Sequence, residues 1–153
     1  MTCRSLSFAA LALVLFGPEQ APAEELAPKA EQLVTEAKKV QLEAQDISKE
    51  LKPRGFDLAR VQEMMANLER HVTSVDQLVK DLAPHEPQMT SHQKAKYEAV
   101  KMKAQLLTVF ITNKRNILAG DELSKNRSLL RSKADGIARR AELLQQSAMA
   151  LRR

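Results

Sequence analysis

Apolar residues recur at alternating steps of four and three residues in four stretches of this 153-residue chain, over residues 26–51, 58–82, 97–118 and 130–151. The first stretch shows the pattern without interruption, at Leu26, Ala30, Leu33, Ala37, Val40, Ala44, Ile47 and Leu51. The third is interrupted once, by Lys114, whose ammonium group we expect to extend to water. An average step of 3.5 residues places each series on one stripe of a helix, and such stripes pack in left-handed supercoils. The pattern predicts four long amphipathic helices.

Residues that end or begin helices separate the four stretches. The three boundaries contain, in order, Pro53, Gly55 and Asp57, then Pro84, Pro87, Thr90 and Gln93, and finally Gly120 and Asp121. Thr90 and Gln93 have the spacing of a capping box, and Gly120 suits a left-handed helix end. We therefore expect helices over about residues 25–52, 57–83, 91–119 and 122–151.

Short links between long helices make neighbouring helices run antiparallel. The sequence therefore predicts an all-α fold, in which residues 24–153 form one antiparallel up-down-up-down four-helix bundle with coiled-coil-like heptad packing. The chain has only four glycines and no tryptophan, which argues against a β-sandwich, a barrel or a glycine-rich nucleotide fold. Two helical hairpins exchanged between the chains of a dimer are the alternative architecture.

Alanine recurs at every seventh position of the first and the fourth helix. These alanines are Ala30, Ala37 and Ala44 in one helix and Ala134, Ala141 and Ala148 in the other. The equivalent positions of the second and third helices carry larger residues, including Met65 and Tyr97. Because small side chains let helix backbones approach, we expect the first and fourth helices to form a close pair and the second and third a wider one.

The first 23 residues have the pattern of a secretory signal peptide. Arg4 precedes an apolar run over residues 6–16, and residues 21–23 supply small side chains for cleavage after Ala23. The run is shorter than the roughly 20 apolar residues that a membrane-spanning helix needs, although a membrane anchor is the alternative. No second run of spanning length follows. We expect an exported protein, periplasmic or secreted, whose mature chain lacks the only cysteine, Cys3.

Charge is divided unevenly along the mature chain. Residues 24–86 contain nine basic and thirteen acidic residues, a net charge of −4, whereas residues 87–153 contain fourteen basic and five acidic residues, a net charge of +9. The candidate anion-binding or partner-binding surface comprises Lys94, Lys101, Arg127, Arg131, Arg139 and Arg140. Membrane headgroups or envelope polyanions suit this surface better than nucleic acid, because the chain has an export signal and one tyrosine for base stacking. A solvated helix face, or self-association of oppositely charged halves, would give the same pattern.

The third predicted helix is apolar beyond its heptad stripe. Leu106, Val109, Phe110 and Ile117 lie beside that stripe. We interpret them as a broad core face, and the alternative is an exposed patch for a partner.

Two histidines lie in the link before the third helix. His85, Glu86, Met89 and His92 could together bind Zn or Cu at one end of the bundle. The alternative is a polar loop whose histidines are solvated.

No pattern of catalytic residues accompanies these features. The inward stripes are almost entirely aliphatic, no glutamate has a histidine three residues later, and no Cys-x-x-Cys-His motif is present. We therefore expect no enzyme activity and no cofactor. The sequence favours an exported adaptor, scaffold or envelope component that acts through its surface, with a protein or an anionic envelope component as partner. A homo-oligomer, a periplasmic chaperone-like holdase and a metal-binding protein at the His85–His92 end stay open as alternatives.

Overall fold

The protein is all-helical in the computed structural model, which describes residues 22–53, 55–118 and 126–152. Four long α-helices and one short 3-10 helix account for most of these residues, and none of them forms a strand. The elements are α1 (Pro22–Glu50), α2 (Leu58–Leu82), η1 (Ala83–Gln88), α3 (Ser91–Leu118) and α4 (Arg127–Leu151). The predicted four-helix bundle is confirmed.

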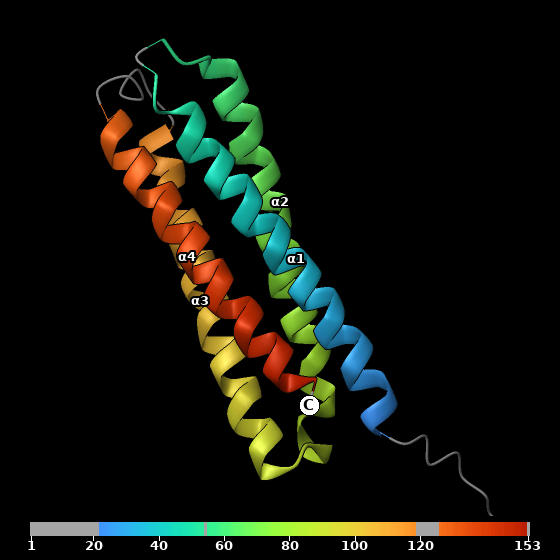
Figure 1. The fold of residues 1–153 in the computed structure, drawn as a ribbon. Helices are drawn as coiled ribbons and strands as arrows, with labels where there is room; N and C mark the ends of the chain where they lie inside the picture. Colours follow the sequence, from blue (N-terminus) through green and yellow to red (C-terminus); the bar gives the residue numbers. More distant parts are fainter. Residues whose placement is uncertain (1–21, 54, 119–125, 153) are drawn as a thin grey trace, which may run out of the picture.

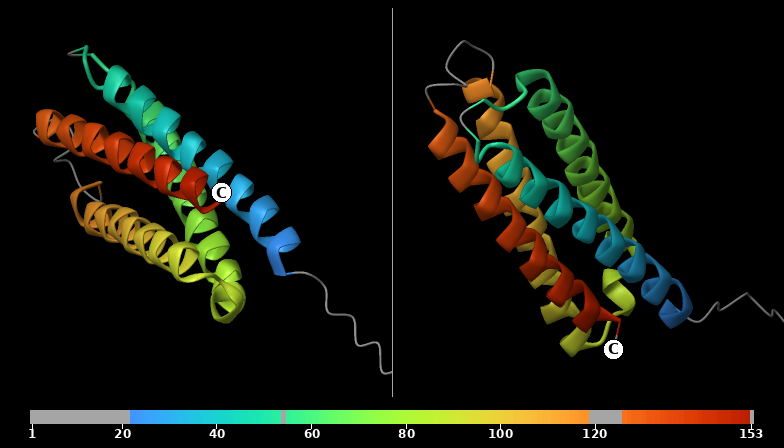
Figure 2. Two further views of the ribbon diagram at one scale, coloured as in Figure 1. Left: turned by 60° about the horizontal axis from the view of Figure 1, so that its bottom comes forward. Right: turned by 45° about the horizontal axis from the view of Figure 1, so that its top comes forward.

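The four long helices lie side by side around one interior (Figure 1). The chain ascends along α1, returns along α2, ascends again along α3 and returns along α4 (Figure 1). Helix α1 packs against α2 and α4, and α3 packs against the same two helices, so that each has two neighbours (Figure 2). The oppositely charged halves of the sequence consequently lie on opposite sides of the bundle, α1 and α2 on one side and α3 and α4 on the other.

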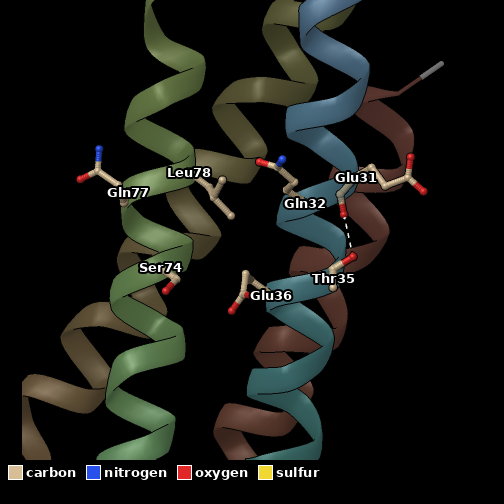
Figure 3. A pocket seen from close by; sticks show the side chains of 7 residues that line it. All are labelled: Glu31, Gln32, Thr35, Glu36, Ser74, Gln77 and Leu78. Atoms are coloured by element: carbon tan, nitrogen blue, oxygen red, sulfur yellow. Dashed lines mark hydrogen bonds between the residues drawn. The ribbon is translucent and has the colours of Figure 1, made fainter.

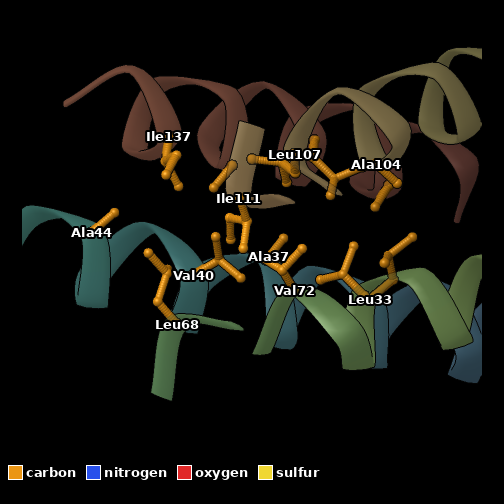
Figure 4. Packing of buried hydrophobic residues seen from close by; sticks show 14 of the residues in the cluster. Leu33, Ala37, Val40, Ala44, Leu68, Val72, Ala104, Leu107, Ile111 and Ile137 are labelled. Atoms are coloured by element: carbon orange, nitrogen blue, oxygen red, sulfur yellow. The ribbon is translucent and has the colours of Figure 1, made fainter. Parts of the chain in front are cut away.

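The predicted heptad stripes form the core. Side chains from the helices point toward one another in the interior, as Figure 4 shows for Leu33, Leu68, Leu107 and Ile137. Every described member of the four stripes is buried except Leu58, which is 46% exposed. Leu58 is the first residue of α2, at the end of the bundle, where a neighbouring helix no longer covers the stripe. The side chains of Lys114 and Leu118 lie outside the described residues.

Packing is most extensive between α1 and α4 and least extensive between α2 and α3. The six recurring alanines of α1 and α4 are all fully buried. Their methyl groups allow the two backbones to approach, while the larger residues of α2 and α3 hold those helices further apart. This confirms the predicted close and wide helix pairs.

Two buried amides interrupt the aliphatic contact between α1 and α4. Gln145 Nε2 donates to Gln41 Oε1 over 2.9 Å and to the carbonyl oxygen of Ala37 over 3.5 Å. Lys38 Nζ donates to the same Oε1 atom of Gln41 over 3.2 Å. Within the described residues, no buried side-chain nitrogen or oxygen lacks a hydrogen-bond partner.

The helix boundaries follow two of the predicted caps. Asp57 accepts from the backbone N–H of Arg60 over 3.2 Å, and Thr90 and Gln93 make both hydrogen bonds of a capping box. The link after α2 forms the 3-10 helix η1, which the sequence pattern does not reveal. Helix α4 is described from Arg127 onward, and the predicted start at residue 122 lies outside the described residues. The predicted boundary at Gly120 and Asp121 lies outside the described residues.

The signal peptide predicted over residues 1–23 falls almost entirely outside the described residues, and α1 begins at Pro22, within its last positions. Among the helices that the structure describes, none combines the length and the apolar character that crossing a membrane requires.

Candidate binding surface between α3 and α4

Six basic residues were predicted to form one surface, and the structure gathers only three of them. Arg131, Arg139 and Arg140 of α4 line one hollow, to which α3 contributes Phe110. At 3.6 residues per turn, Arg139 and Arg140 point about 100° apart around α4 and Arg131 points about 180° from Arg140, so the three arginines share the hollow through their long side chains rather than through one helix face. Arg131 and Arg139 are exposed, and Arg140 is half-buried.

The other three basic residues lie apart from this group. Lys94 is exposed in the first turn of α3, at the end of the bundle opposite to the start of α4. Lys101 Nζ lies 2.7 Å from a carboxylate oxygen of Glu98, and this hydrogen bond raises the pKa of Lys101. Arg127 Nη1 donates to the carbonyl oxygen of Pro53 over 2.8 Å and joins the start of α4 to the link after α1. The structure therefore does not bring the six residues into one hollow, and their joint role as a binding surface stays a prediction.

We call the hollow around the three arginines the arginine compartment. It has a volume of about 530 Å³. Its lining residues are Phe110, Ser128, Arg131, Ser132, Asp135, Gly136, Arg139 and Arg140. All but Phe110 come from α4, so that guanidinium groups and hydroxyls of that helix line the same hollow.

A second hollow, the apolar compartment, continues the groove toward the C-terminal end of α4. It has a volume of about 460 Å³ and is lined by Met102, Lys103, Leu106, Gly136, Arg139, Arg140 and Leu143. Met102 is 56% exposed, and Leu106 and Leu143 are each 48% exposed. The two compartments share three lining residues, and together we call them the α3–α4 groove.

A glycine of α4, Gly136, lies at the junction of the two compartments. The guanidinium of Arg140 lies 4.2 Å from the centre of the Phe110 ring, and its Nη1 donates to the carbonyl oxygen of Gly136 over 3.1 Å. A Cβ atom on Gly136 would lie 3.2 Å from that Nη1 and 3.7 Å from the ring of Phe110. Glycine thus allows Arg140 and the aromatic ring to stack against the helix backbone.

The arginines of the groove are not paired with any carboxylate of the described residues. Among the described residues, no acidic side chain forms an ion pair with Arg131, Arg139 or Arg140. Asp135 lines the arginine compartment and lowers its positive charge, and three guanidinium groups exceed that one carboxylate. Guanidinium forks bind carboxylate or phosphate oxygens in pairs, and they remain charged at any physiological pH.

The broad core face predicted for the third helix is wrong at two positions. Leu106 is 48% exposed and Val109 is 55% exposed, whereas Phe110 is half-buried against the core. Together with Met102, the two exposed residues form a second apolar stripe on α3, at steps of four and three residues. The alternative interpretation, an exposed apolar patch, is the one that fits. Ile117 lies outside the described side chains.

The residues predicted to bind a metal do not form a ligand set. Met89 is buried in the hydrophobic core, and His92 is exposed in the first turn of α3. His85 and Glu86 lie in η1, where Lys29 Nζ lies 2.9 Å from His85 Nε2. In the part of the chain that the structure describes, no three His, Cys, Asp or Glu side chains are placed to hold a metal ion together.

A third groove, of about 440 Å³, lies between α1 and α2 on the acidic side of the bundle (Figure 3). Glu31 and Glu36 both line this groove, but each lies near a basic partner. Glu36 accepts from Lys39 and from His71, while Glu31 lies 3.7 Å from Arg152. Burial raises the pKa of Glu36, but the two hydrogen bonds outweigh burial and lower the pKa overall. Because Glu31 and Glu36 lie near basic partners of the same chain, they offer less negative charge for self-association with the basic half of another copy.

Comparison with protein families, with curated proteins and with solved structures finds no match for this chain. The side chains of the α3–α4 groove themselves indicate which ligands it could bind. Its arginines and serines suit an anion, and its leucines and methionine suit an apolar group.

Proposed function

We propose that this protein is an exported helical bundle, periplasmic or secreted, that acts by binding through its surface rather than by catalysis. Its partner is anionic and belongs to the cell envelope, and the α3–α4 groove is the binding surface. The observation that carries the proposal is the group of three arginines of α4 that line one hollow without a carboxylate partner among the described residues. A cleaved signal peptide over residues 1–23 would deliver the bundle to that compartment.

Binding is favoured over catalysis by the character of the interior. The buried stripes are aliphatic apart from Tyr97, and the buried amides of Gln41 and Gln145 bond to each other. We propose that these stripes pack as an antiparallel, coiled-coil-like bundle, which leaves the outer faces of the helices as the surfaces available to a partner.

Retention on an anionic support tests this proposal. We expect the protein to bind at low salt and to be released by about 0.3 M salt, because screening weakens exposed charge interactions. The variant Arg131→Gln/Arg139→Gln should elute at clearly lower salt than the wild type.

A matched control variant distinguishes an effect of the groove on retention from an effect of net charge alone. Arg60→Gln/Arg70→Gln removes the same charge from α2, where Arg60 lies 3.5 Å from Glu50 and Arg70 is hydrogen-bonded to Asn67. We expect this control to elute with the wild type. Equal shifts for the two double variants would show that net charge alone governs retention, and the groove would lose its assigned role.

A chaperone-like holdase is the second candidate function, and the exposed apolar stripe of α3 favours it. A holdase would use Met102, Leu106 and Val109 to cover unfolded clients. Aggregation of a reduced, unfolded client, followed by light scattering at stoichiometric amounts of the protein, tests this candidate. Unchanged scattering would dismiss it.

A further inference from the structure

We propose that the α3–α4 groove binds one molecule of an anionic lipid, with a phosphate headgroup in the arginine compartment and a hydrocarbon chain in the apolar compartment. The inference rests on the proposed function, because it names the anionic envelope component that the groove receives. Nothing in the groove requires the lipid to be chemically changed, so the expected activity is binding alone.

The order of side chains along the groove carries the proposal. On α4, Ser128 and Arg131 lie at one end of the groove and Leu143 at the other, which corresponds to a length of about 22 Å at the rise of an α-helix. On α3, Phe110 lines the arginine compartment, whereas Leu106 lines the apolar one. The aliphatic side chains of both helices, Leu106 and Leu143, therefore lie toward the same end of the groove, next to Arg139 and Arg140, which line both compartments.

A lipid matches this arrangement better than a partner helix does. An amphipathic helix carries its polar and apolar sides in parallel along its whole length and would require apolar lining along the full groove, whereas the arginine compartment has no aliphatic side chain. A lipid carries its charged and apolar parts end to end. Three cations, Lys103, Arg139 and Arg140, also line the apolar compartment, and Lys103 donates to Ser147 of α4.

The size and chemistry of each compartment suit the corresponding part of the ligand. Volumes of about 530 and 460 Å³ lie within the range of small-molecule sites, roughly 300–1,000 Å³. The exposed guanidinium groups of Arg131 and Arg139 can each offer two donors to phosphate oxygens. A hydrocarbon chain against Met102, Leu106 and Leu143 would remove apolar surface from water on both partners.

Calorimetric titration with dodecyl phosphate, kept below its critical micelle concentration, tests the proposal on the full bundle. Inorganic phosphate and the neutral detergent dodecyl maltoside serve as the head alone and the tail alone. We expect dodecyl phosphate to bind at least about tenfold more tightly than either, since a charge-assisted contact and apolar burial then act together. Far-ultraviolet circular dichroism at each ligand concentration verifies that the helices stay folded.

Two variants separate head from tail recognition. Arg131 lines only the arginine compartment, so Arg131→Gln should weaken dodecyl phosphate about tenfold and leave dodecyl maltoside unchanged. Leu106→Gln should weaken both detergents and leave inorganic phosphate unchanged. The controls are Arg70→Gln and Leu42→Gln, since Leu42 is 47% exposed on α1, nearly the same as Leu106, and neither control residue lines the groove. Both controls should bind like the wild type.

Several results would overturn the inference. Equal affinity for the anionic and the neutral detergent would indicate adsorption to apolar surface, and equal affinity for inorganic phosphate would indicate a free-anion site. Tight binding of an acidic amphipathic peptide, without binding of dodecyl phosphate, would make the groove a protein-docking surface and would leave the proposed function standing. If retention on the anionic support were also independent of Arg131 and Arg139, both proposals would fail.

Discussion

Gln41 and Gln145 place two amides in a helix contact otherwise dominated by alanine and aliphatic side chains. Each is nearly buried, with exposures of 9% and 8%, and each satisfies the other through the 2.9 Å hydrogen bond. Aliphatic side chains would fit several alignments of α1 and α4, whereas this pair forms only when the two residues face each other. The amides therefore select the register of the closest helix pair.

Removal of one amide should lower the free energy of unfolding more than replacement of both amides. Gln145→Ala leaves the Gln41 carbonyl with only Lys38 as donor and should lower the free energy of unfolding by about 1–3 kcal/mol. Gln41→Leu/Gln145→Leu should be closer to the wild type, because no buried amide then lacks its partner. Urea unfolding measures both, with the exposed neighbour Gln146→Ala as control. A double variant less stable than the single one would contradict the pairing.

Tyr97 should make the fold sensitive to alkaline pH. Its side chain is 1% exposed, its hydroxyl donates to the carbonyl oxygen of Val79 over 3.2 Å, and burial raises the pKa of the phenol. Lys101 opposes this rise, while Glu86 and Glu98 add to it. Because the folded pKa lies above the unfolded value of about 10, this contribution to stability is complete below pH 10 and decreases as pH rises through the folded pKa.

The measurement is urea unfolding of wild type and Tyr97→Phe at neutral pH and above pH 10. The variant should be less stable by about 0.5–1.5 kcal/mol at neutral pH, since it loses the hydrogen bond to Val79. It should then lose less stability than the wild type as pH rises further. Parallel losses in the two proteins would assign the alkaline effect to lysines instead.

At the scale of helices, the sequence pattern predicts the inward faces well and the outward faces poorly. The heptad steps identify the core of each helix, and Asp57 and Thr90 mark two helix starts through local hydrogen bonds. The same steps do not distinguish whether Leu106 and Val109 widen the core or face water. That depends on how far α4 covers α3, which is a property of the packed helices.

Overpacking one alanine tests the close approach of α1 and α4. Ala37 is fully buried, and Ala37→Leu should lower the free energy of unfolding by about 1–3 kcal/mol, because the added atoms must separate the backbones. The exposed Ala66→Leu on α2 is the matched control and should lie within about 0.5 kcal/mol of the wild type. Thermal unfolding compares the two. Equal effects would mean that α1 and α4 leave room for larger side chains.

The whole molecule has one hydrophobic core to which all four long helices contribute. Neither hairpin, α1–α2 or α3–α4, encloses its own heptad stripes. We therefore expect a single cooperative unfolding transition, as is usual for domains of this size.

Two probes with different origins test this cooperativity. Circular dichroism reports all helices, whereas the fluorescence of the only tyrosine, Tyr97, reports the contact of α3 with α2, and the chain has no tryptophan. The two urea curves should share one midpoint. Separate midpoints would show that the hairpins unfold independently, as an architecture of exchanged hairpins would allow.

The sequence by itself determined the number of helices, their inward faces, two of their caps and the closest helix pair, because these follow from residue spacing and from contacts within a few residues. Only the tertiary structure decided which arginines share a surface, that α3 exposes a second apolar stripe, and that Gln41 meets Gln145. Those features join residues that are distant in sequence. Their meeting depends on the rotation and axial alignment of packed helices, which heptad spacing leaves open.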